Sequence, residues 1–170
     1  MARRAAAGDR AAFATLAERH YDRVYALAWR WSGARAEAQD IAQDAMVKIA
    51  TAMNGFRNDC AFTSWVYRIA YTTAVDHIRA RRRVVALEPA RISALADGAD
   101  NETPENDMIG QELWRAVRAL PDQQRDAVLL VYAQDLSHGE AAALMGCSEK
   151  TVSWHLHEAR KRLRIILEAV

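Results

Sequence analysis

The stretch SHGEAAALMGCSEKTVSWHLHEARKRLR, residues 137–164, predicts two helices joined by a tight turn. Ser137 and Glu140 form the S-x-x-E pattern of a capping box, in which each side chain satisfies a backbone N–H at the start of a helix. Gly146 is expected to end this short helix, because glycine tolerates the left-handed conformation found there. Ser148 then caps the second helix. The stretch is typical of a helix-turn-helix, which commonly places its second helix in the major groove of DNA.

The second helix of this motif has two different faces. Apolar residues recur at spacings of four and three, so they form one stripe for a core: Val152, Leu156, Ala159, Leu163 and Ile166. At about 100° per residue, the opposite side holds polar and basic residues: Lys150, Ser153, Trp154, His157, Lys161 and Arg164. A solvated bundle surface is the plain alternative for such a charge run. The capped tight turn in front of it favours DNA binding.

A further helix is expected just before the motif. Pro121 suits its first position, where the missing N–H costs nothing, and Asp135 marks its end. Its apolar face is expected from four residues: Val128, Leu129, Leu130 and Tyr132.

Length and composition predict an all-α protein. A chain of 170 residues, 51% of them apolar, holds one ordinary domain or two small ones. Only seven glycines and three prolines interrupt it, and Ala, Leu and Arg are abundant. The net charge of +1 hides a segregated distribution, because residues 60–86 and 148–164 are basic and residues 87–107 carry six acids against one Arg. Basic patches on two folded parts are compatible with nucleic-acid binding.

The chain is expected to divide at its acidic middle. Residues 87–107 have few large apolar residues and no helical period, the composition of a flexible linker. This predicts a first domain over 1–86 and a second over 108–170. Three helices are expected in the first domain: 9–33 with Asp9 as its cap, 34–53, and 62–83 after a short loop.

Four arginines stand at the end of the third predicted helix. Cations at a helix C-terminus are stabilised by the helix dipole, typically by ~0.3–1 kcal/mol each. Four within five residues exceed what capping requires, so phosphate contact is the better interpretation: Arg79, Arg81, Arg82 and Arg83.

These motifs together resemble a known family. DIAQD at 40–44, FRNDCAFTSWVYRIA at 56–70 and DHIRARRR at 76–83 resemble, in order and spacing, conserved region 2 of the extracytoplasmic-function (ECF) sigma factors, group 4 of the sigma-70 family. LPDQQR at 120–125 and residues 137–164 look like their region 4. The resemblance covers nearly the whole chain except the expected linker. It implies a subunit that joins core RNA polymerase and directs it to promoter DNA.

The resemblance assigns core-polymerase binding to the second helix. Asp40, Gln43 and Asp44 lie within about one turn and form an acidic and polar patch that suits a basic partner surface. A solvated helix face is the alternative.

The loop after this helix, and the helix that follows, would bind and open the downstream (−10) element. Holding unstacked bases requires aromatic surfaces and cations on the phosphates. Each aromatic taken singly is more often core, and core is preferred for Trp65. Thr72 stands where the family commonly has Asn, which would change the favoured base. The assigned residues are Phe56, Arg57, Arg68, Tyr71, Thr72, Arg79, Arg81, Arg82 and Arg83.

Region 4 would bind the upstream (−35) element, and here the chain departs from the family. Ser153 and Trp154 stand where a basic and then a small polar residue are usual, and Glu158 stands where Arg is common. Fewer cations reduce the electrostatic part of DNA affinity. A Glu accepting from cytosine N4, or Trp154 packing on a sugar edge, would compensate. The assigned residues are Lys150, Thr151, Ser153, Trp154, His157, Glu158, Arg160 and Lys161.

Other chemistry has little support in the sequence. His155 and His157 point about 200° apart on a helix, so a metal site with Cys147 and His138 is not expected. Nothing pairs a nucleophile with a base, so neither a cofactor nor an enzymatic activity is expected. Two distant cysteines, and no leader or membrane-spanning run, predict a cytoplasmic protein that does not insert into membranes.

Two alternatives stay open. The chain could be a sigma mimic that binds an anti-sigma factor without promoter recognition, which Glu158 and Ser153 favour and the arginines disfavour. It could also be a stand-alone helix-turn-helix regulator. For a sigma factor without a receptor domain, control by a partner anti-sigma factor and a monomeric free state are expected.

Overall fold

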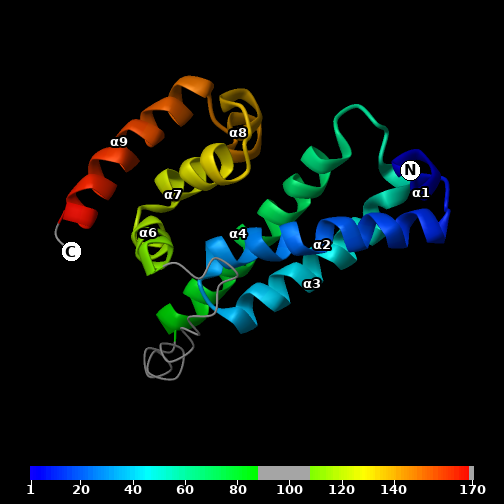
Figure 1. Cartoon of the computed structure of the whole chain (residues 1–170), viewed down its shortest axis with the longest axis horizontal. Coiled ribbons are helices and arrows are strands. Elements are labelled where there is room, and N and C mark those ends of the chain that lie inside the picture. The colour runs from blue at the N-terminus through cyan, green and yellow to red at the C-terminus, as the bar shows by residue number, and fades with distance from the viewer. Residues whose placement is uncertain (88–107, 169–170) are drawn as a thin grey trace. The chain divides into compact units, whose positions relative to one another are not determined.

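Helices form the regular secondary structure of the described part of the chain, residues 1–87 and 108–168, in this computed structural model (Figure 1). The chain divides into two compact units, Met1–Asp100 and Asn101–Val170, named unit 1 and unit 2. The prediction of an all-α fold with two small domains is confirmed. The expected acidic linker, apart from Leu87, lies outside the described residues. None of the helices within the described ranges is long and apolar enough to span a bilayer.

Unit 1 begins with a short helix that the sequence patterns did not indicate, α1 (Ala2–Ala6). The long α2 (Arg10–Ser32) follows, and its start is capped by Asp9, whose carboxylate accepts a hydrogen bond from the backbone N–H of Ala12 at 3.0 Å. Gly33 ends α2 in the left-handed conformation, with φ 75°. Both ends match the prediction.

Two further helices follow in the described part of unit 1. They are α3 (Arg35–Ala52), which runs into the 3₁₀ turn η1 (Met53–Gly55), and α4 (Phe62–Leu87). The sequence placed the end of α4 at Arg83, so the helix is one turn longer than predicted. A loop over residues 56–61 connects η1 to α4.

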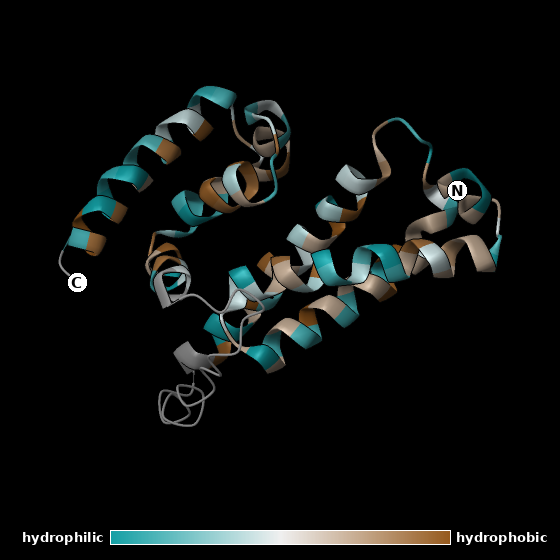
Figure 2. Cartoon of the chain, in the orientation of Figure 1, coloured by the Kyte–Doolittle hydropathy of each residue, from teal (hydrophilic) through white to brown (hydrophobic). Residues whose placement is uncertain are grey.

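The core of unit 1 lies where α2, α3 and α4 pack on one another. Figure 2 shows the apolar residues of these helices gathered toward their shared interior. Burial of each large aliphatic side chain contributes about 1.5–3 kcal/mol. The most deeply buried large side chains are Val24, Leu27, Ile41, Ile49 and Val66.

Unit 2 contains α6 (Met108–Arg118), α7 (Asp122–Val128) and the π turn η4 (Leu129–Ala133) before the helix-turn-helix. Sequence reasoning did not identify α6. Pro121 is the N-cap of α7 rather than its first residue.

The apolar face predicted for this part of unit 2 is partly wrong. Val128, Leu129 and Leu130 are buried, but Tyr132 is 51% exposed. The Tyr132 hydroxyl accepts a hydrogen bond from the Arg160 guanidinium on the surface of unit 2, which holds the ring at the edge of the core.

The helix-turn-helix is formed by α8 (His138–Met145) and α9 (Glu149–Glu168), and the residues predicted to cap and end its helices are confirmed. The Ser137–Glu140 capping box is complete, and Gly146 ends α8 with φ 67°. The Ser148 hydroxyl accepts a hydrogen bond from the Thr151 N–H at 3.1 Å. The expected stripe of α9 packs on unit 2: Val152, Leu156 and Ala159 are buried, and Leu163 and Ile166 half-buried.

We predict that acid destabilises unit 1 through His20. Burial, followed by the nearby Arg23 and Arg19, lowers the pKa of His20 below its ordinary value of 6.5. The folded state therefore favours the neutral ring, so this stability is present above pH 6.5 and is lost as the pH falls below it. His20→Phe, which keeps the aromatic contact with Phe62, is expected to flatten the dependence of the melting temperature on pH between 7 and 5 (about the range in which histidine titrates).

The matched control for this prediction is the exposed His157 of unit 2. His157→Phe is expected to leave the pH dependence of unit 1 unchanged. Equal flattening by both variants would show that His20 has no special part in the acid response.

Candidate functional site

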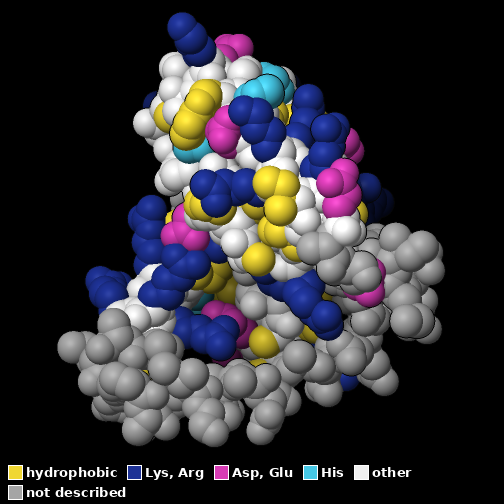
Figure 3. Space-filling view, turned by 90° about the vertical axis from the view of Figure 1, so that its left-hand side faces the viewer, with side chains coloured by type: hydrophobic (Ala, Val, Ile, Leu, Met, Phe, Trp, Pro, Cys, Tyr) yellow, Lys and Arg dark blue, Asp and Glu magenta, His cyan; other side chains and the backbone are white. Residues whose placement is uncertain are grey.

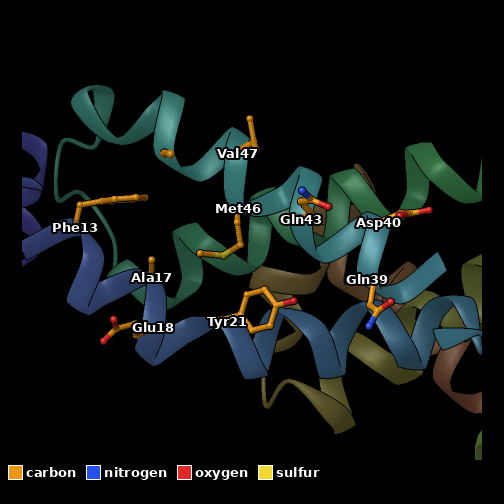
Figure 4. Close-up of a pocket in the computed structure, with 10 residues that line it drawn as sticks. Phe13, Ala17, Glu18, Tyr21, Gln39, Asp40, Gln43, Met46 and Val47 are labelled. Atoms are coloured by element: carbon orange, nitrogen blue, oxygen red, sulfur yellow. The ribbon is translucent and has the colours of Figure 1, made fainter. Parts of the chain in front are cut away.

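A groove of about 720 Å³ lies between α2 and α3 in unit 1 (Figure 4). Asp40 and Gln43, both assigned to polymerase binding, lie on its α3 side, where Met46 extends toward α2. Tyr21 and Val47 expose apolar surface at the groove, with 42% and 59% of each residue accessible. The lining residues are Phe13, Ala17, Glu18, Tyr21, Gln39, Asp40, Gln43, Met46, Val47 and Ala50.

Asp44, the third residue of the predicted acidic patch, has different partners. Its carboxylate contacts Lys48 Nζ and His77 Nε2, both at 3.1 Å, so it links α3 to α4. Burial raises the pKa of Asp44, but the hydrogen bonds from Lys48 and His77 outweigh it and hold that pKa below the ordinary value. Of the three predicted residues, Asp40 and Gln43 therefore line the groove, whereas Asp44 connects α3 to α4.

The apolar part of the groove was missed by sequence reasoning. The signal that could have indicated it is the spacing of four between Phe13, Ala17 and Tyr21, which places these residues on one side of α2. An apolar floor beside Asp40 and Gln43 is the composition of a protein-binding surface, with a hydrophobic centre and a polar rim.

The loop after η1 presents polar side chains above an apolar base. Arg57 is exposed, and Asn58 adopts a left-handed conformation with φ 61°. Phe56 is only 7% exposed, and its ring lies 5.2 Å from that of Trp65. The expectation that the Phe56 ring is available to a base is therefore corrected, because the ring is part of the core.

Tyr71 is likewise a core residue. It is 6% exposed, and its ring packs edge-on against Trp31, with 5.7 Å between ring centroids. Arg68 and Thr72 are exposed on the same helix. The Thr72 hydroxyl lies 3.0 Å from the carbonyl oxygens of both Arg68 and Ile69, which fixes its orientation and leaves its oxygen able to accept a hydrogen bond.

The four arginines of α4 lie before its last turn, which contains no basic residue. The helix-dipole explanation weakens accordingly, since that effect is confined to the final turn. Arg81 forms an ion pair with Glu37 of α3, so its charge is partly neutralised and it contributes to the helix packing. Arg79, Arg82 and Arg83 are exposed.

The outward face of α9 combines basic, aromatic and hydroxyl side chains. Figure 3 looks onto the side on which α9 lies and shows Lys and Arg interspersed with acidic and apolar side chains. Trp154 is 55% exposed. Ser153 donates to the Glu149 carbonyl at 3.0 Å and lies 3.0 Å from His138 Nδ1, which ties α9 to the start of α8. Thr151 is half-buried beside the cap of α9, and Lys150 and His157 are exposed.

Three of the predicted contact residues on α9 have partners within unit 2: Glu158, Arg160 and Lys161. Glu158 accepts a hydrogen bond from Lys161 Nζ at 3.0 Å, and this bond holds the pKa of Glu158 below its ordinary value. The Arg160 guanidinium, besides bonding the Tyr132 hydroxyl, lies 5.8 Å from the centre of that ring. The Glu158–Lys161 pair lowers the net positive charge that the helix offers to a phosphate, whereas the neutral Tyr132 orients Arg160 and leaves its charge intact.

Comparisons with known proteins match both units. The model of sigma-70 region 2 matches residues 16–84, and that of sigma-70 region 4 matches residues 110–163. The chain is 33% identical to the ECF RNA polymerase sigma-E factor of Escherichia coli K12, over 92% of this chain and 86% of that one.

Two solved structures are similar in fold. CnrH in complex with the cytosolic domain of CnrY aligns over 99% of this chain and 95% of its own, with a TM-score of 0.70 and 30% identity. The sigma factor RpoE of Bartonella quintana, in complex with the anti-sigma factor NepR, covers 92% of this chain and 96% of its own, with a TM-score of 0.76 and 23% identity.

We predict that Arg83 contributes to DNA binding without supporting the fold. Arg83→Ala is expected to reduce the magnitude of the salt slope of DNA affinity by about 0.9 for a duplex phosphate contact, and by less for a single strand. Arg81→Ala is expected to lower the melting temperature as well, because Glu37 loses its partner. Salt titrations and thermal melts of both variants test this.

The control is Arg3→Ala, which removes an exposed positive charge from α1 instead. It is expected to leave the salt slope unchanged. A slope in Arg83→Ala equal to that of the wild type would exclude Arg83 from the DNA interface.

Proposed function

Because the chain belongs to the ECF sigma factors of the sigma-70 family, we propose that it binds core RNA polymerase and directs it to specific promoters. The observation that carries this proposal is the presence of both regions in one chain, each as a compact helical unit with an exposed basic helix face. Members of this family are not known as enzymes, and we assign the chain no catalytic role. Its place of action is the cytoplasm, where its template and polymerase are.

Unit 1 supplies the polymerase contact and the downstream promoter contact. Asp40 and Gln43, at the groove between α2 and α3, meet the polymerase, because the groove combines apolar surface with a carboxylate. Arg57, Arg68 and Thr72, together with the exposed arginines of α4, contact the −10 element.

Unit 2 supplies the upstream promoter contact through α9. Lys150, Trp154 and His157 are exposed on its outward face and reach the groove of the −35 element. Ser153 and Thr151 support this face through hydrogen bonds to His138 and Ser148. Glu158 faces the DNA with its charge balanced by Lys161.

An anti-sigma factor is the regulator that we expect. The RpoE structure of similar fold is a complex with an anti-sigma factor. A partner that covers the groove of unit 1 or the outward face of α9 would prevent holoenzyme formation or promoter binding.

A sigma mimic is the second candidate, and Glu158 is the observation in its favour. An acid on the recognition helix repels phosphates, and a protein that binds only an anti-sigma factor would tolerate it. Reconstitution with core RNA polymerase and genomic DNA, followed by mapping of transcript starts, decides between the two. A sigma factor gives new starts that share upstream elements, whereas a mimic gives none.

We predict that charge reversal at the groove weakens polymerase binding. Asp40→Lys is expected to lower affinity for core polymerase by about tenfold or more, since like charges at an interface cost several kcal/mol. Asp44 is left intact because its pairs with Lys48 and His77 support the fold. Fluorescence titration of labelled protein with core polymerase measures the change.

The control for Asp40→Lys is Glu112→Lys, the same charge reversal at an exposed position of α6 in unit 2. It is expected to bind core polymerase within about twofold of the wild type, because a lone exposed charge contributes little. If both variants lost affinity for core polymerase equally, the loss would be due to the change in net charge. Asp40 would then not belong to the interface.

We also predict that Glu158→Arg strengthens DNA binding by unit 2. The substitution replaces repulsion by attraction and releases Lys161 from its hydrogen bond. The gain is expected to be largest at low salt, where exposed charges are least screened. If Glu158 instead contacts a cytosine, affinity for random DNA rises while the preference for the cognate promoter falls.

The control is Glu168→Arg, the same change at the exposed end of α9. It is expected to raise affinity less than Glu158→Arg does. Unchanged DNA affinity of Glu158→Arg at every salt concentration would place residue 158 outside the DNA interface.

A further inference from the structure

The short helix α1 packs against the base of the loop that connects η1 to α4. Ala5 of α1, Met53 of η1 and Phe56 at the start of the loop are buried in one hydrophobic cluster with two residues of α2. Partly buried neighbours complete this cluster, named here the loop-base cluster: Ala2, Ala6, Phe13, Phe62 and Trp65.

Two aromatic rings close the loop at its base. Phe56 and Phe62 stand at the two ends of the segment 57–61, and their ring centroids lie 5.4 Å apart in an edge-to-face arrangement of 84°. Such pairs are worth about 0.5–1.5 kcal/mol beyond their burial. The five residues between them are all exposed. The loop therefore consists of a packed aromatic base and a solvent-exposed tip.

A helix as short as α1 has little stability of its own. Isolated helices shorter than about 12–15 residues are marginal in water, and α1 has five. It is held by the burial of Ala5 and by an ion pair from Arg4 to Asp9, the cap of α2, at 2.7 Å. Its alanines bring its backbone close to η1 and Phe56, so the ordering of α1 is coupled to that of the loop base.

We propose that α1 is a positioning element for the 57–61 tip, with Ala5 as its central residue. The inference rests on the proposed function, in which Arg57 of this loop contacts the −10 element. By packing in the loop-base cluster, α1 keeps Phe56 in place. Phe56 in turn keeps residues 57–61 in one orientation, and this lets them distinguish one base from another. Ala5 does not touch DNA and acts through Phe56.

The test compares two variants in holoenzyme, with the promoter mapped by transcript starts. Ala5→Asp puts a carboxylate into the loop-base cluster, whereas Ala7→Asp puts it at the exposed end of α1. The probes are duplex promoter DNA carrying 2-aminopurine in the −10 element, and single-stranded −10 oligonucleotides that differ at one base. Ala5→Asp is expected to slow promoter opening by about tenfold, and Ala7→Asp by less than about twofold, where tenfold corresponds to 1.4 kcal/mol.

Base discrimination separates positioning from a merely structural role. The affinity ratio between the preferred oligonucleotide and the substituted ones is expected to fall toward one in Ala5→Asp holoenzyme. Loss of affinity for all oligonucleotides in equal proportion would overturn the proposal, since it would reflect general destabilisation.

If the Ala5→Asp protein does not fold, a second variant tests whether α1 positions residues 57–61. Deletion of residues 2–7 removes α1 without burying a charge and keeps Asp9 as the cap of α2. The deletion is expected to speed amide hydrogen exchange at 57–61 and to reduce base discrimination. Wild-type exchange and discrimination in the deletion variant would overturn the role of α1, whereas failure of the unmodified holoenzyme to open any promoter would instead refute the proposed function.

Discussion

The long helices that the structure describes each bury one stripe of side chains, and that constraint decides which side chains remain exposed and available to a partner. In α4 the stripe contains Val66 and Tyr71, and Tyr71 completes the core by packing on Trp31. Arg68 and Thr72 lie off the stripe and remain exposed. Functional surfaces in so small a unit are therefore the faces that the core does not use. Phe56 and Tyr71 are among the aromatic residues that belong to the core.

Ion pairs further separate the residues that connect helices from those that are available to a partner. Glu37–Arg81 and Asp44–His77 both connect α3 to α4, so two residues that resemble binding groups in the sequence serve the helix pair. Each of these partly exposed pairs adds a modest amount to the stability of unit 1.

Much of the fold could be predicted because it depends on local signals. The Asp9 cap, the Ser137 capping box and Gly146 act within a few residues, so pattern and structure agree there. The short α1 lacks such signals, because its stability comes from tertiary contacts with η1. Phe56 and Tyr71 were misplaced for a related reason, since burial depends on neighbours distant in sequence. The roles of the exposed candidates remain predictions.

The side chains of α9 indicate how DNA binding by unit 2 is divided between phosphate contacts and base contacts. Lys161 is paired with Glu158, so α9 offers one fewer unneutralised cation to phosphates, and Arg160 is oriented by the neutral Tyr132 hydroxyl. Phosphate contacts supply affinity without sequence information, whereas base contacts supply specificity. An exposed Trp154 beside a reduced set of cations shifts the balance toward apolar and base-edge contacts. Binding of unit 2 to DNA should therefore depend less on salt, and more on sequence, than it would with arginine at position 158.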